Sequence, residues 1–283
     1  MKRLVRLIAG AAGLLTFLAA GAAMAQSSGT AEPWQLGMQN AVGPVAEEGH
    51  DFWNLLLWIC IVISVFVMAL LAYVMVRFRA SANPTPSKTS HNTVIEIIWT
   101  IVPVIILLVI FVPSMRFLYF QDKVAEADVT LQATGHQWYW SYEYPEQGFE
   151  YTSILLEGDD LGEGDKRLLS VDNPVVIPEG ATVRLLTTST DVIHSWAMPA
   201  FFVKLDAVPG RLNETWFRAT EEGTFYGQCS ELCGIRHGFM PIEVHVVSQE
   251  EFEDWVADMK EEYATRQAPD RTRLARADVT ATQ

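Results

Sequence analysis

The twelve residues from Cys229 to Met240 carry several side chains that bind metals. This segment contains the thiols of Cys229 and Cys233, the imidazole of His237 and the thioether of Met240. His194 lies upstream, at the end of a segment with the pattern of a strand. Thiolates and thioethers are soft ligands that suit copper, and imidazole binds the same metal. The sequence therefore predicts a copper site built from these five residues.

The second cysteine bears on the number of metal ions. A mononuclear blue-copper site uses one Cys, two His and a weakly bound Met, so a second thiolate is surplus to one ion. Two thiolates can each bridge two coppers, and His194 and His237 can then bind one copper apiece. Met240 and a backbone carbonyl would fill the remaining weak positions. This pattern favours a binuclear centre.

Two other interpretations of the cysteines stay open at this point. In an oxidising compartment Cys229 and Cys233 can form a disulfide, and Cys and His together also bind zinc. Neither interpretation accounts for Met240. The third cysteine, Cys60, lies in an apolar run, where a thiol behaves as a small hydrophobe.

Two long apolar runs precede the metal-binding segment. Residues 55–76 and 97–115 are each long enough, at about 1.5 Å per residue, to cross a hydrocarbon core of about 30 Å as a helix. We predict transmembrane helices at about 53–77 and 95–119. The loop between them carries Arg and Lys and no acid from residue 77 to 95, which places it in the cytoplasm. The mature N-terminus and everything after the second helix would then lie outside.

The first 25 residues have the pattern of a secretory signal peptide. Lys2, Arg3 and Arg6 precede a short apolar core, and Ala-Met-Ala precedes Gln26. We expect cleavage after Ala25. The alternative is a retained third span, for which the apolar core is short.

The remainder is predicted to be an outer domain at 121–262, after an N-terminal and membrane part at 26–120. Short β-rich segments with turns between them suggest a small sandwich or barrel. Ser248 and Glu251 form a capping box that predicts a closing helix at 250–260, and residues 263–283 form a polar tail. The expected strands are 129–144, 168–171, 182–188, 214–218 and 242–247, with turns at 172–174 and 178–180.

The net charge of -14 argues against nucleic-acid binding, because phosphates need a basic surface. An acidic surface favours a basic partner. The alternative is that like charge only keeps the domain soluble.

The sequence resembles a known family. Residues 227–241, Gly-Gln-Cys-Ser-Glu-Leu-Cys-Gly-Ile-Arg-His-Gly-Phe-Met-Pro, resemble the CuA loop of cytochrome c oxidase subunit II. Residues 135–144, 194–196 and 206–211 match as well, and the likeness runs from Gln35 to the closing helix. It implies a membrane α-hairpin of two helices followed by an all-β, cupredoxin-like Greek-key barrel. It also implies a multi-pass protein of the bacterial inner membrane, with the N-terminus and the C-terminal domain on the periplasmic side.

The resemblance implies roles for the metal-binding residues. The five side chains would bind two copper ions in a CuA centre, with Glu231 contributing its backbone carbonyl. The Glu231 side chain would bind a magnesium or manganese ion shared with subunit I, although by itself it reads as an ordinary loop acid. The ligands are His194, Cys229, Glu231, Cys233, His237 and Met240.

The resemblance also implies an activity and partners. The chain would accept electrons from a soluble or membrane-bound cytochrome c and pass them to haem in subunit I, where oxygen is reduced to water and protons are pumped. The haems would lie only in subunit I, and the chain would assemble with subunits I and III in the lipid bilayer. The sequence has no C-x-x-C-H motif, so we expect the donor to be a separate protein.

Three further roles follow from the likeness. Trp138 would be the point of electron entry, although aromatic strand residues are more often core, and Trp138, Trp140 and Tyr142 would share one strand face. Glu96 would stand at the entrance of the K proton pathway, although a carboxylate at a helix N-terminus is also favoured by the helix dipole. The acids that would dock cytochrome c are Glu143, Asp172 and Asp191, each of which can equally be a solvated charge.

Two rival functions share parts of this pattern. A quinol oxidase subunit II has the same hairpin and barrel but lacks the copper ligands. A membrane-tethered binding or assembly module would use the cysteines as a disulfide or carry copper to another protein. Such a module would not need Trp138 together with the whole Glu231 loop.

Overall fold

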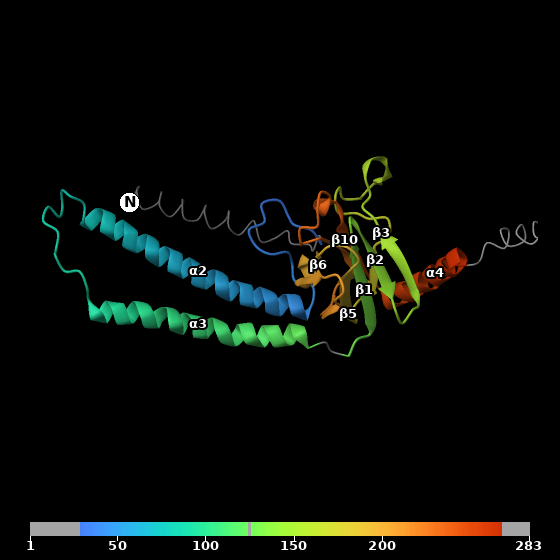
Figure 1. The fold of residues 1–283 in the computed structure, drawn as a ribbon, viewed down its shortest axis with the longest axis horizontal. Helices are drawn as coiled ribbons and strands as arrows, with labels where there is room; N and C mark the ends of the chain where they lie inside the picture. Colours follow the sequence, from blue (N-terminus) through green and yellow to red (C-terminus); the bar gives the residue numbers. More distant parts are fainter. Residues whose placement is uncertain (1–28, 124–125, 268–283) are drawn as a thin grey trace, which may run out of the picture.

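The computed structural model describes residues 29–123 and 126–267. Two long helices lead into a domain of ten strands, and one more helix closes the described part of the chain (Figure 1). The predicted signal peptide, at 1–25, and the tail beyond residue 267 lie outside the described residues.

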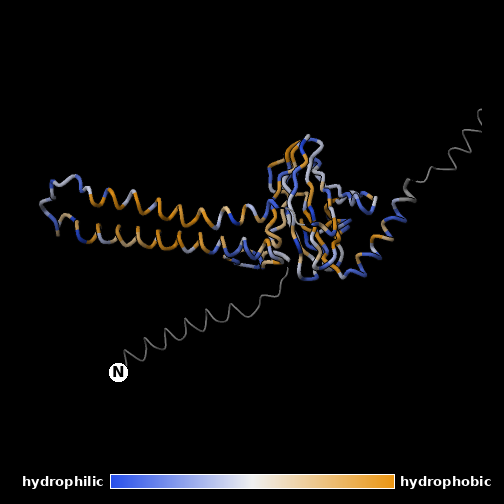
Figure 2. Tube along the Cα trace, turned by 90° about the horizontal axis from the view of Figure 1, so that it is seen from below, coloured by the Kyte–Doolittle hydropathy of each residue, from blue (hydrophilic) through white to orange (hydrophobic). Residues whose placement is uncertain are grey.

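The two long helices form the predicted hairpin. Helix α2 spans Pro44–Arg77 and helix α3 spans Thr93–Asp122, and both are long and apolar enough to cross a membrane. They run side by side, apolar along most of their length (Figures 1 and 2). At about 1.5 Å per residue, the 34 residues of α2 extend about 51 Å, more than a hydrocarbon core of about 30 Å needs.

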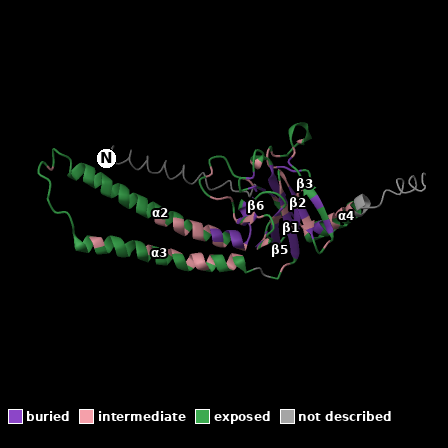
Figure 3. Cartoon of the chain, in the orientation of Figure 1, coloured by how far each residue is buried: buried purple, intermediate pink, exposed green. Residues whose placement is uncertain are grey.

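The extra length of α2 lies at its outer end, where the helix packs against the β domain. Val45, Ala46 and Gly49 are buried there, although the membrane-spanning part of the same helix is exposed (Figure 3). The two helices are also joined near this end by an ion pair of 3.3 Å between Arg116 and Glu48. The sequence placed the start of this helix about nine residues too late because its first turns are amphipathic and not uniformly apolar.

Helix α3 begins at a side-chain cap. Asn92 Oδ1 accepts hydrogen bonds from the backbone N–H groups of Val94 and Ile95, at 3.1 and 3.3 Å. Glu96 Oε1 accepts a hydrogen bond from the backbone N–H of Asn92 at 3.0 Å. These contacts satisfy donors that a helix N-terminus otherwise leaves unpaired.

The outer domain is an all-β domain of two main sheets, as predicted. One sheet has the order β3-β2-β1-β5-β8 and a second has the order β4-β10-β9, while β6 and β7 form a separate pair. Two pairings, β1 with β5 and β4 with β10, are parallel, and the others are antiparallel. The strands are β1 (Val129–His136), β2 (Tyr139–Tyr144), β3 (Phe149–Ser153), β4 (Val175–Pro178), β5 (Thr182–Ser189), β6 (His194–Met198), β7 (Val203–Ala207), β8 (Asn213–Arg218), β9 (Gly223–Gln228) and β10 (Pro241–Val247). A membrane hairpin followed by a cupredoxin-like β domain is therefore confirmed as the fold class.

The core lies between the sheets and draws on both (Figure 3). In β2 the buried residues Trp140, Tyr142 and Tyr144 alternate with more exposed ones, as the period of two in a strand requires. Burying such large aromatic side chains supplies much of the driving force for folding.

One predicted strand is wrong, because residues 129–144 form a hairpin. Strand β1 ends at His136 and β2 starts at Tyr139, so Gln137 and Trp138 form the turn. Trp138 therefore does not share a strand face with Trp140 and Tyr142, as the single strand had required. The turn contains neither Gly nor Asn, and its β-forming aromatic residues gave no sign of a break.

The segment 168–171 is not a strand either. It forms a turn, and Val171 makes only an isolated bridge to Leu155. The turns at 172–174 and 178–180 connect β-structure as expected. The sequence did not predict β3, β4, β6, β7 or β9.

The closing helix α4 spans Gln249–Gln267, seven residues longer at its C-terminal end than the predicted 250–260. The capping box is confirmed, because Glu251 N donates to Ser248 Oγ at 3.2 Å and Ser248 N donates to Glu251 Oε2 at 3.1 Å. Trp255 packs its ring edge-on against Tyr144 and Phe149, which fastens the helix to the β domain.

Candidate metal centre

Three strand ends meet at the predicted metal site. His194 is the first residue of β6 and not the end of a strand, as the sequence pattern had indicated. Cys229 directly follows β9, and Met240 directly precedes β10. Strands β9 and β10 pair antiparallel, with Gln228 opposite Pro241, so both ends of the loop from 229 to 240 are fixed. The pairing of β9 with β10 holds the first and last candidate ligands of the loop close together.

The structure brings the five predicted side chains into one cluster. The Sγ atoms of Cys229 and Cys233 are 3.9 Å apart. His194 Nδ1 lies 3.8 Å from Cys229 Sγ, and His237 Nδ1 lies 3.5 Å from Cys233 Sγ. Met240 Sδ lies 3.5 Å from Cys233 Sγ. Each thiol thus has an imidazole nitrogen within 4 Å.

The backbone of the loop supplies another donor atom. The carbonyl oxygen of Glu231 accepts a hydrogen bond from Cys229 Sγ at 3.4 Å, whereas the Glu231 residue as a whole is exposed. The sixth predicted position is therefore in the cluster through its backbone, with its side chain toward the surface of the loop.

The cluster fits copper by the chemistry of its donors. Both cysteines are free thiols, and their separation of 3.9 Å is nearly twice a disulfide bond of about 2.05 Å. It is also shorter than twice a metal–sulfur bond of about 2.3 Å, so both sulfurs can contact the same ion. The thioether of Met240, only 1% exposed, has no place in a disulfide and is rare in zinc sites.

The centre has a buried inner side and a more open outer side. His194, Cys229, Cys233 and Met240 are all buried, whereas His237 is half-buried. The inner ligands are held by the β domain, and the outer imidazole lies close to the surface of the loop.

The surroundings of Cys229 favour its thiolate form. Burial raises the pKa of the Cys229 thiol, but hydrogen bonds from His194 and the loop backbone outweigh that effect and lower the pKa below its ordinary value. Burial and the neighbouring charge of Cys229 raise the pKa of Cys233. Because the thiolate is the form that binds a metal, the first proton leaves easily and the second leaves when a cation offsets the charge.

Asp191 orients the buried imidazole. Its Oδ1 lies 2.9 Å from His194 Nε2, so that nitrogen is held as the donor and Nδ1 faces Cys229. Asp191 also accepts hydrogen bonds from the backbone N–H groups of Gln137 and Val192, at 2.7 and 2.6 Å. Burial would raise the pKa of Asp191, but these bonds, with that from His194 first, lower it. A carboxylate behind a metal-binding imidazole fixes the tautomer and the ring direction.

From the sequence Asp191 was expected only as a docking acid, and its contact with His194 was not foreseen. The signal was present as the Asp-Val-Ile-His spacing, which places a carboxylate three residues before an imidazole. Gly135 was missed as well: a Cβ atom there would lie 2.7 Å from His194 Cδ2, so only glycine leaves room for the ring.

Trp138 lies against the metal-binding loop, partly buried. Its Nε1 donates a hydrogen bond to the carbonyl oxygen of Cys233 at 3.3 Å, and Gln137 Nε2 donates to the same oxygen at 2.7 Å. The ring also crosses close to Gly234, where a Cβ atom would meet it at 3.0 Å. The hairpin turn thus places an indole directly beside a candidate metal ligand.

The other predicted residues lie apart from the cluster. Glu96 stands at the N-terminal end of α3, at the opposite end of the hairpin from the β domain (Figure 1). Glu143, on β2, accepts a hydrogen bond from Gln132 Nε2 at 3.3 Å, and Asp172 accepts one from the backbone N–H of Ile154 at 2.7 Å.

Comparisons with known proteins cover both parts of the chain. Residues 129–247 match the family described as cytochrome c oxidase subunit II, periplasmic domain, and residues 31–117 match cytochrome c oxidase subunit II, transmembrane domain. Probable cytochrome c oxidase subunit 2 of Rickettsia bellii is 54% identical over 226 residues, which cover 80% of this chain and 84% of that protein. Cytochrome c oxidase subunit 2 of Zea mays is 46% identical over 235 residues, 81% of this chain and 90% of that one.

Two solved structures are similar to the outer domain. The periplasmic domain of subunit II of cytochrome oxidase from Bradyrhizobium japonicum is 52% identical and covers 50% of this chain and 100% of that one, with a TM-score of 0.47. The second is a mixed disulfide intermediate between a thioredoxin-like protein and subunit II of cytochrome c oxidase. It is 51% identical, covers 50% of this chain and 97% of that one, and has a TM-score of 0.44.

Proposed function

The chain belongs to the cytochrome c oxidase subunit II family, and we propose that its outer domain binds two copper ions and accepts electrons from cytochrome c. The electrons then pass to haem in subunit I, for proton-pumping reduction of oxygen to water. The observation that carries this proposal is the meeting of two free thiols, two imidazoles and a thioether at the strand ends.

The pairing of ligands supports two ions. Cys229 has His194 beside it and Cys233 has His237 beside it, so the donors divide into two similar halves about the sulfur pair. The Glu231 carbonyl lies near Cys229 and the Met240 thioether near Cys233. A single ion would leave part of this set without a metal.

Copper supplies the redox chemistry when it is bound, and the protein supplies a fixed cage. Asp191 fixes the His194 ring, and the indole N–H of Trp140 donates to the Met240 carbonyl at 3.3 Å. The backbone N–H of Ser230 donates to the Ser195 carbonyl at 3.0 Å, which joins the loop to β6. Ligands held in this way move little between oxidation states, which keeps the energy of reorganisation small.

Trp138 is proposed as the point of electron entry. Its indole hydrogen-bonds to the carbonyl of Cys233 and is partly exposed, so it can touch both a ligand and a docked partner. Substituting Trp138→Phe should slow electron entry from cytochrome c and leave the optical and paramagnetic spectra of copper unchanged. If the copper spectra are lost with the indole, Trp138 is structural.

The charge of the chain supports a basic donor. With a net charge of -14, the molecule attracts a cationic protein, raising the association rate at low salt. Glu143, Asp172 and Asp191 are proposed as docking acids, and all three lie at exposed or half-exposed positions. The Asp191 carboxylate is also hydrogen-bonded to the imidazole of His194.

The remaining roles concern the membrane part and the assembly. The exposed apolar faces of α2 and α3 are proposed to contact lipid and subunits I and III in a bacterial inner membrane, with the β domain on the periplasmic side. Glu96 is proposed at the entrance of a proton pathway. The exposed Glu231 carboxylate is proposed to bind magnesium or manganese together with subunit I.

Metal stoichiometry tests the main proposal. The full chain, purified in detergent and loaded with copper, should hold two ions, and its paramagnetic spectrum should show one unpaired electron shared by two copper nuclei. One copper per chain, or none, would contradict a binuclear centre. A spectrum of isolated copper would favour a copper-carrying module, and a chain that binds no copper would favour a quinol oxidase subunit.

A further inference from the structure

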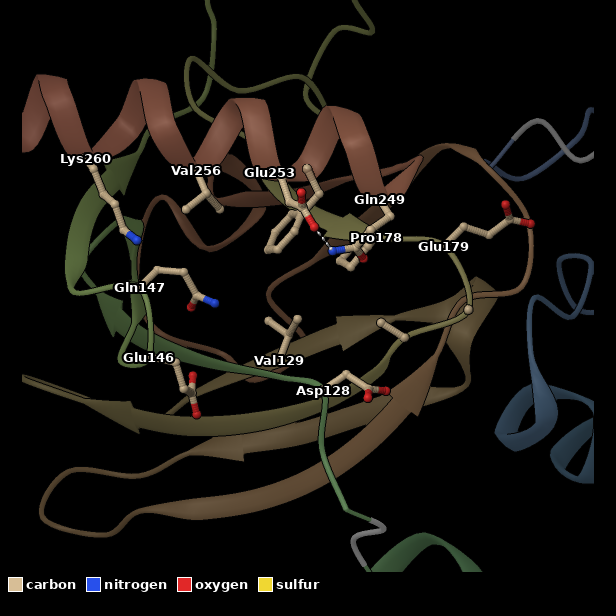
Figure 4. A pocket seen from close by; sticks show the side chains of 13 residues that line it. Asp128, Val129, Glu146, Gln147, Pro178, Glu179, Gln249, Glu253, Val256 and Lys260 are labelled. Atoms are coloured by element: carbon tan, nitrogen blue, oxygen red, sulfur yellow. Dashed lines mark hydrogen bonds between the residues drawn. The ribbon is translucent and has the colours of Figure 1, made fainter.

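A cleft lies between α4 and the β domain, on a different element from the metal-binding loop (Figure 4). It has a volume of about 630 Å³ and is bordered by the start of β1, the β2–β3 turn, the β4–β5 turn and one face of α4. Its apolar side chains include Val129, Phe252 and Val256. The metal proposal gives this cleft no role.

The cleft is strongly acidic. Four carboxylates and one ammonium group line it, and each carboxylate has several acceptor positions. Asp128 accepts the backbone N–H of Thr182 at 2.8 Å, and Glu146 accepts that of Thr130 at 3.3 Å. These bonds leave acceptor positions free on both. The charged lining residues are Asp128, Glu146, Glu179, Glu253 and Lys260.

One polar side chain in the cleft lacks a partner. Gln147 Oε1 is shielded from solvent and makes no hydrogen bond within the described residues. Figure 4 shows the amide reaching into the space between α4 and the strand below it. A buried acceptor without a donor is unfavourable, so an occupant that brings N–H groups would be stabilised there.

These features select arginine as the occupant. A guanidinium carries five N–H donors and a permanent positive charge, which suits the carboxylates and the Gln147 oxygen. The aliphatic part of an arginine side chain packs on apolar surface such as that of Val129 and Val256. Lysine offers fewer donors and no planar group.

The chain carries such arginines directly after α4. Sixteen residues follow Gln267, and they include Arg271, Arg273 and Arg276 within a span of six. Pro269 disfavours continuation of the helix beyond its last turn.

The distances allow this segment to return to the cleft. Glu253 lies fourteen residues before Gln267, or about 21 Å along the helix axis. An extended chain spans about 3.3 Å per residue, so Arg273, six residues beyond Gln267, can reach about 20 Å.

We propose that Arg271, Arg273 and Arg276 dock in the cleft between α4 and the β domain, where they pair with its carboxylates and with Gln147. The docked C-terminal segment would then stabilise the packing of α4 against the strands. Exposed ion pairs are individually weak, but the tether gives the arginines a high effective concentration at the cleft. The same pairs are screened by salt, so docking is weakened as ionic strength rises.

A protease that cleaves after arginine and not after lysine tests the proposal on the full-length chain in detergent, because the substitutions introduce lysines. The cleft variant Glu146→Lys/Glu253→Lys should be cleaved after Arg271 and Arg273 roughly two- to tenfold faster than the wild type at low salt, because two ion pairs become repulsive. The control Asp254→Lys/Asp258→Lys makes the same total charge change on α4, at positions outside the cleft, and should be cleaved at the wild-type rate. Adding salt should raise only the rates of the wild type and the control. The products are identified by mass spectrometry.

A second variant guards against misfolding. The side chain of Glu179 makes no hydrogen bond within the described residues, so Glu179→Lys changes the cleft charge without removing a structural contact, and it should also accelerate cleavage. Equal rates in the wild type and in both cleft variants would overturn the proposal. Protection that increases with protein concentration would overturn it too, since the occupant would then be a second copy of the chain.

Discussion

The inner and outer sides of the metal centre are built differently. On the inner side, His194 is buried, hydrogen-bonded to Asp191 and pressed against Gly135. On the outer side, His237 is half-buried, and the residue before it, Arg236, is held by an ion pair to Glu157 whose two side chains are 46% and 50% exposed. The inner ligand therefore has no room to move, whereas the position of the outer ligand depends on surface contacts.

This difference separates two tasks within one centre. A dry, rigid inner side fixes ligand geometry and so limits reorganisation. An outer side close to solvent gives a partner access to the loop. Substitutions on the inner side should therefore abolish or weaken copper binding, and those on the outer side should tune it.

The largest effect is expected at Cys233, whose thiolate would bridge the two coppers of the proposed centre. Substituting Cys233→Ser replaces a soft thiolate with a hydroxyl that stays protonated, so the chain should lose at least one of two coppers. Elemental analysis of the copper-loaded protein measures the ratio. The control is Cys60→Ser in the membrane hairpin, which should keep two coppers. Two coppers in the Cys233 variant would show that the thiol is not a bridge.

The next largest effect is expected on the inner side, at Gly135. A methyl group there would lie 2.7 Å from His194 Cδ2, so Gly135→Ala must displace the imidazole or the strand. Overpacking of this kind costs about 1–3 kcal/mol of folding stability, and copper affinity should fall with it. Gly238→Ala is the matched control in the metal-binding loop, because a Cβ there meets nothing within 4 Å. Chemical denaturation and copper titration measure both quantities, and equal behaviour of the two variants would refute the steric argument.

A substitution at Asp191 tests the inner side without changing the volume of a side chain. Asp191→Asn keeps an acceptor for the backbone N–H groups but loses the charge that holds His194 Nε2 as a donor. The loss of such a carboxylate typically costs 10–100-fold in metal affinity. Glu143→Gln, which removes a carboxylate on β2, should leave copper affinity unchanged while slowing docking of a basic donor. If both variants change only the association rate, Asp191 acts only in docking.

The sequence was enough to name the candidate ligands, because four of the five side chains lie within twelve residues and carry distinctive chemistry. The helix hairpin was equally legible, since long uncharged runs have few other interpretations. The contacts between residues far apart in the sequence could not be predicted. Asp191 reads as a surface acid until the fold turns it toward His194, and Arg236 meets Glu157 across 79 residues of sequence.

Two of the five missed strands, β4 and β6, share a physical cause. Strand β6 and strand β4 are buried at every position, so they lack the polar–apolar alternation by which a half-buried strand is found. The hairpin turn at Trp138 was not predicted for a different reason. Aromatic residues on both sides of it continue the pattern of a strand through the turn. Burial and turn geometry are both set by tertiary contacts.

The smallest effect is expected on the outer side, at the ion pair between Glu157 and Arg236. Arg236 lies between the candidate ligands Cys233 and His237, and its guanidinium also lies over the ring of Phe239, 5.1 Å from its centre. Because the pair is exposed, Glu157→Gln should cost only about 0.2–1 kcal/mol of stability. The same loss should let His237 move, which would broaden the copper spectrum without lowering the metal content.

High salt should broaden the wild-type spectrum in the same way and leave the variant unchanged. Asp159→Gln, an equal charge change in the same loop, is the control. A variant spectrum as sharp as that of the wild type would show that the strand ends alone fix the outer ligand, and that the two sides of the centre are equally rigid.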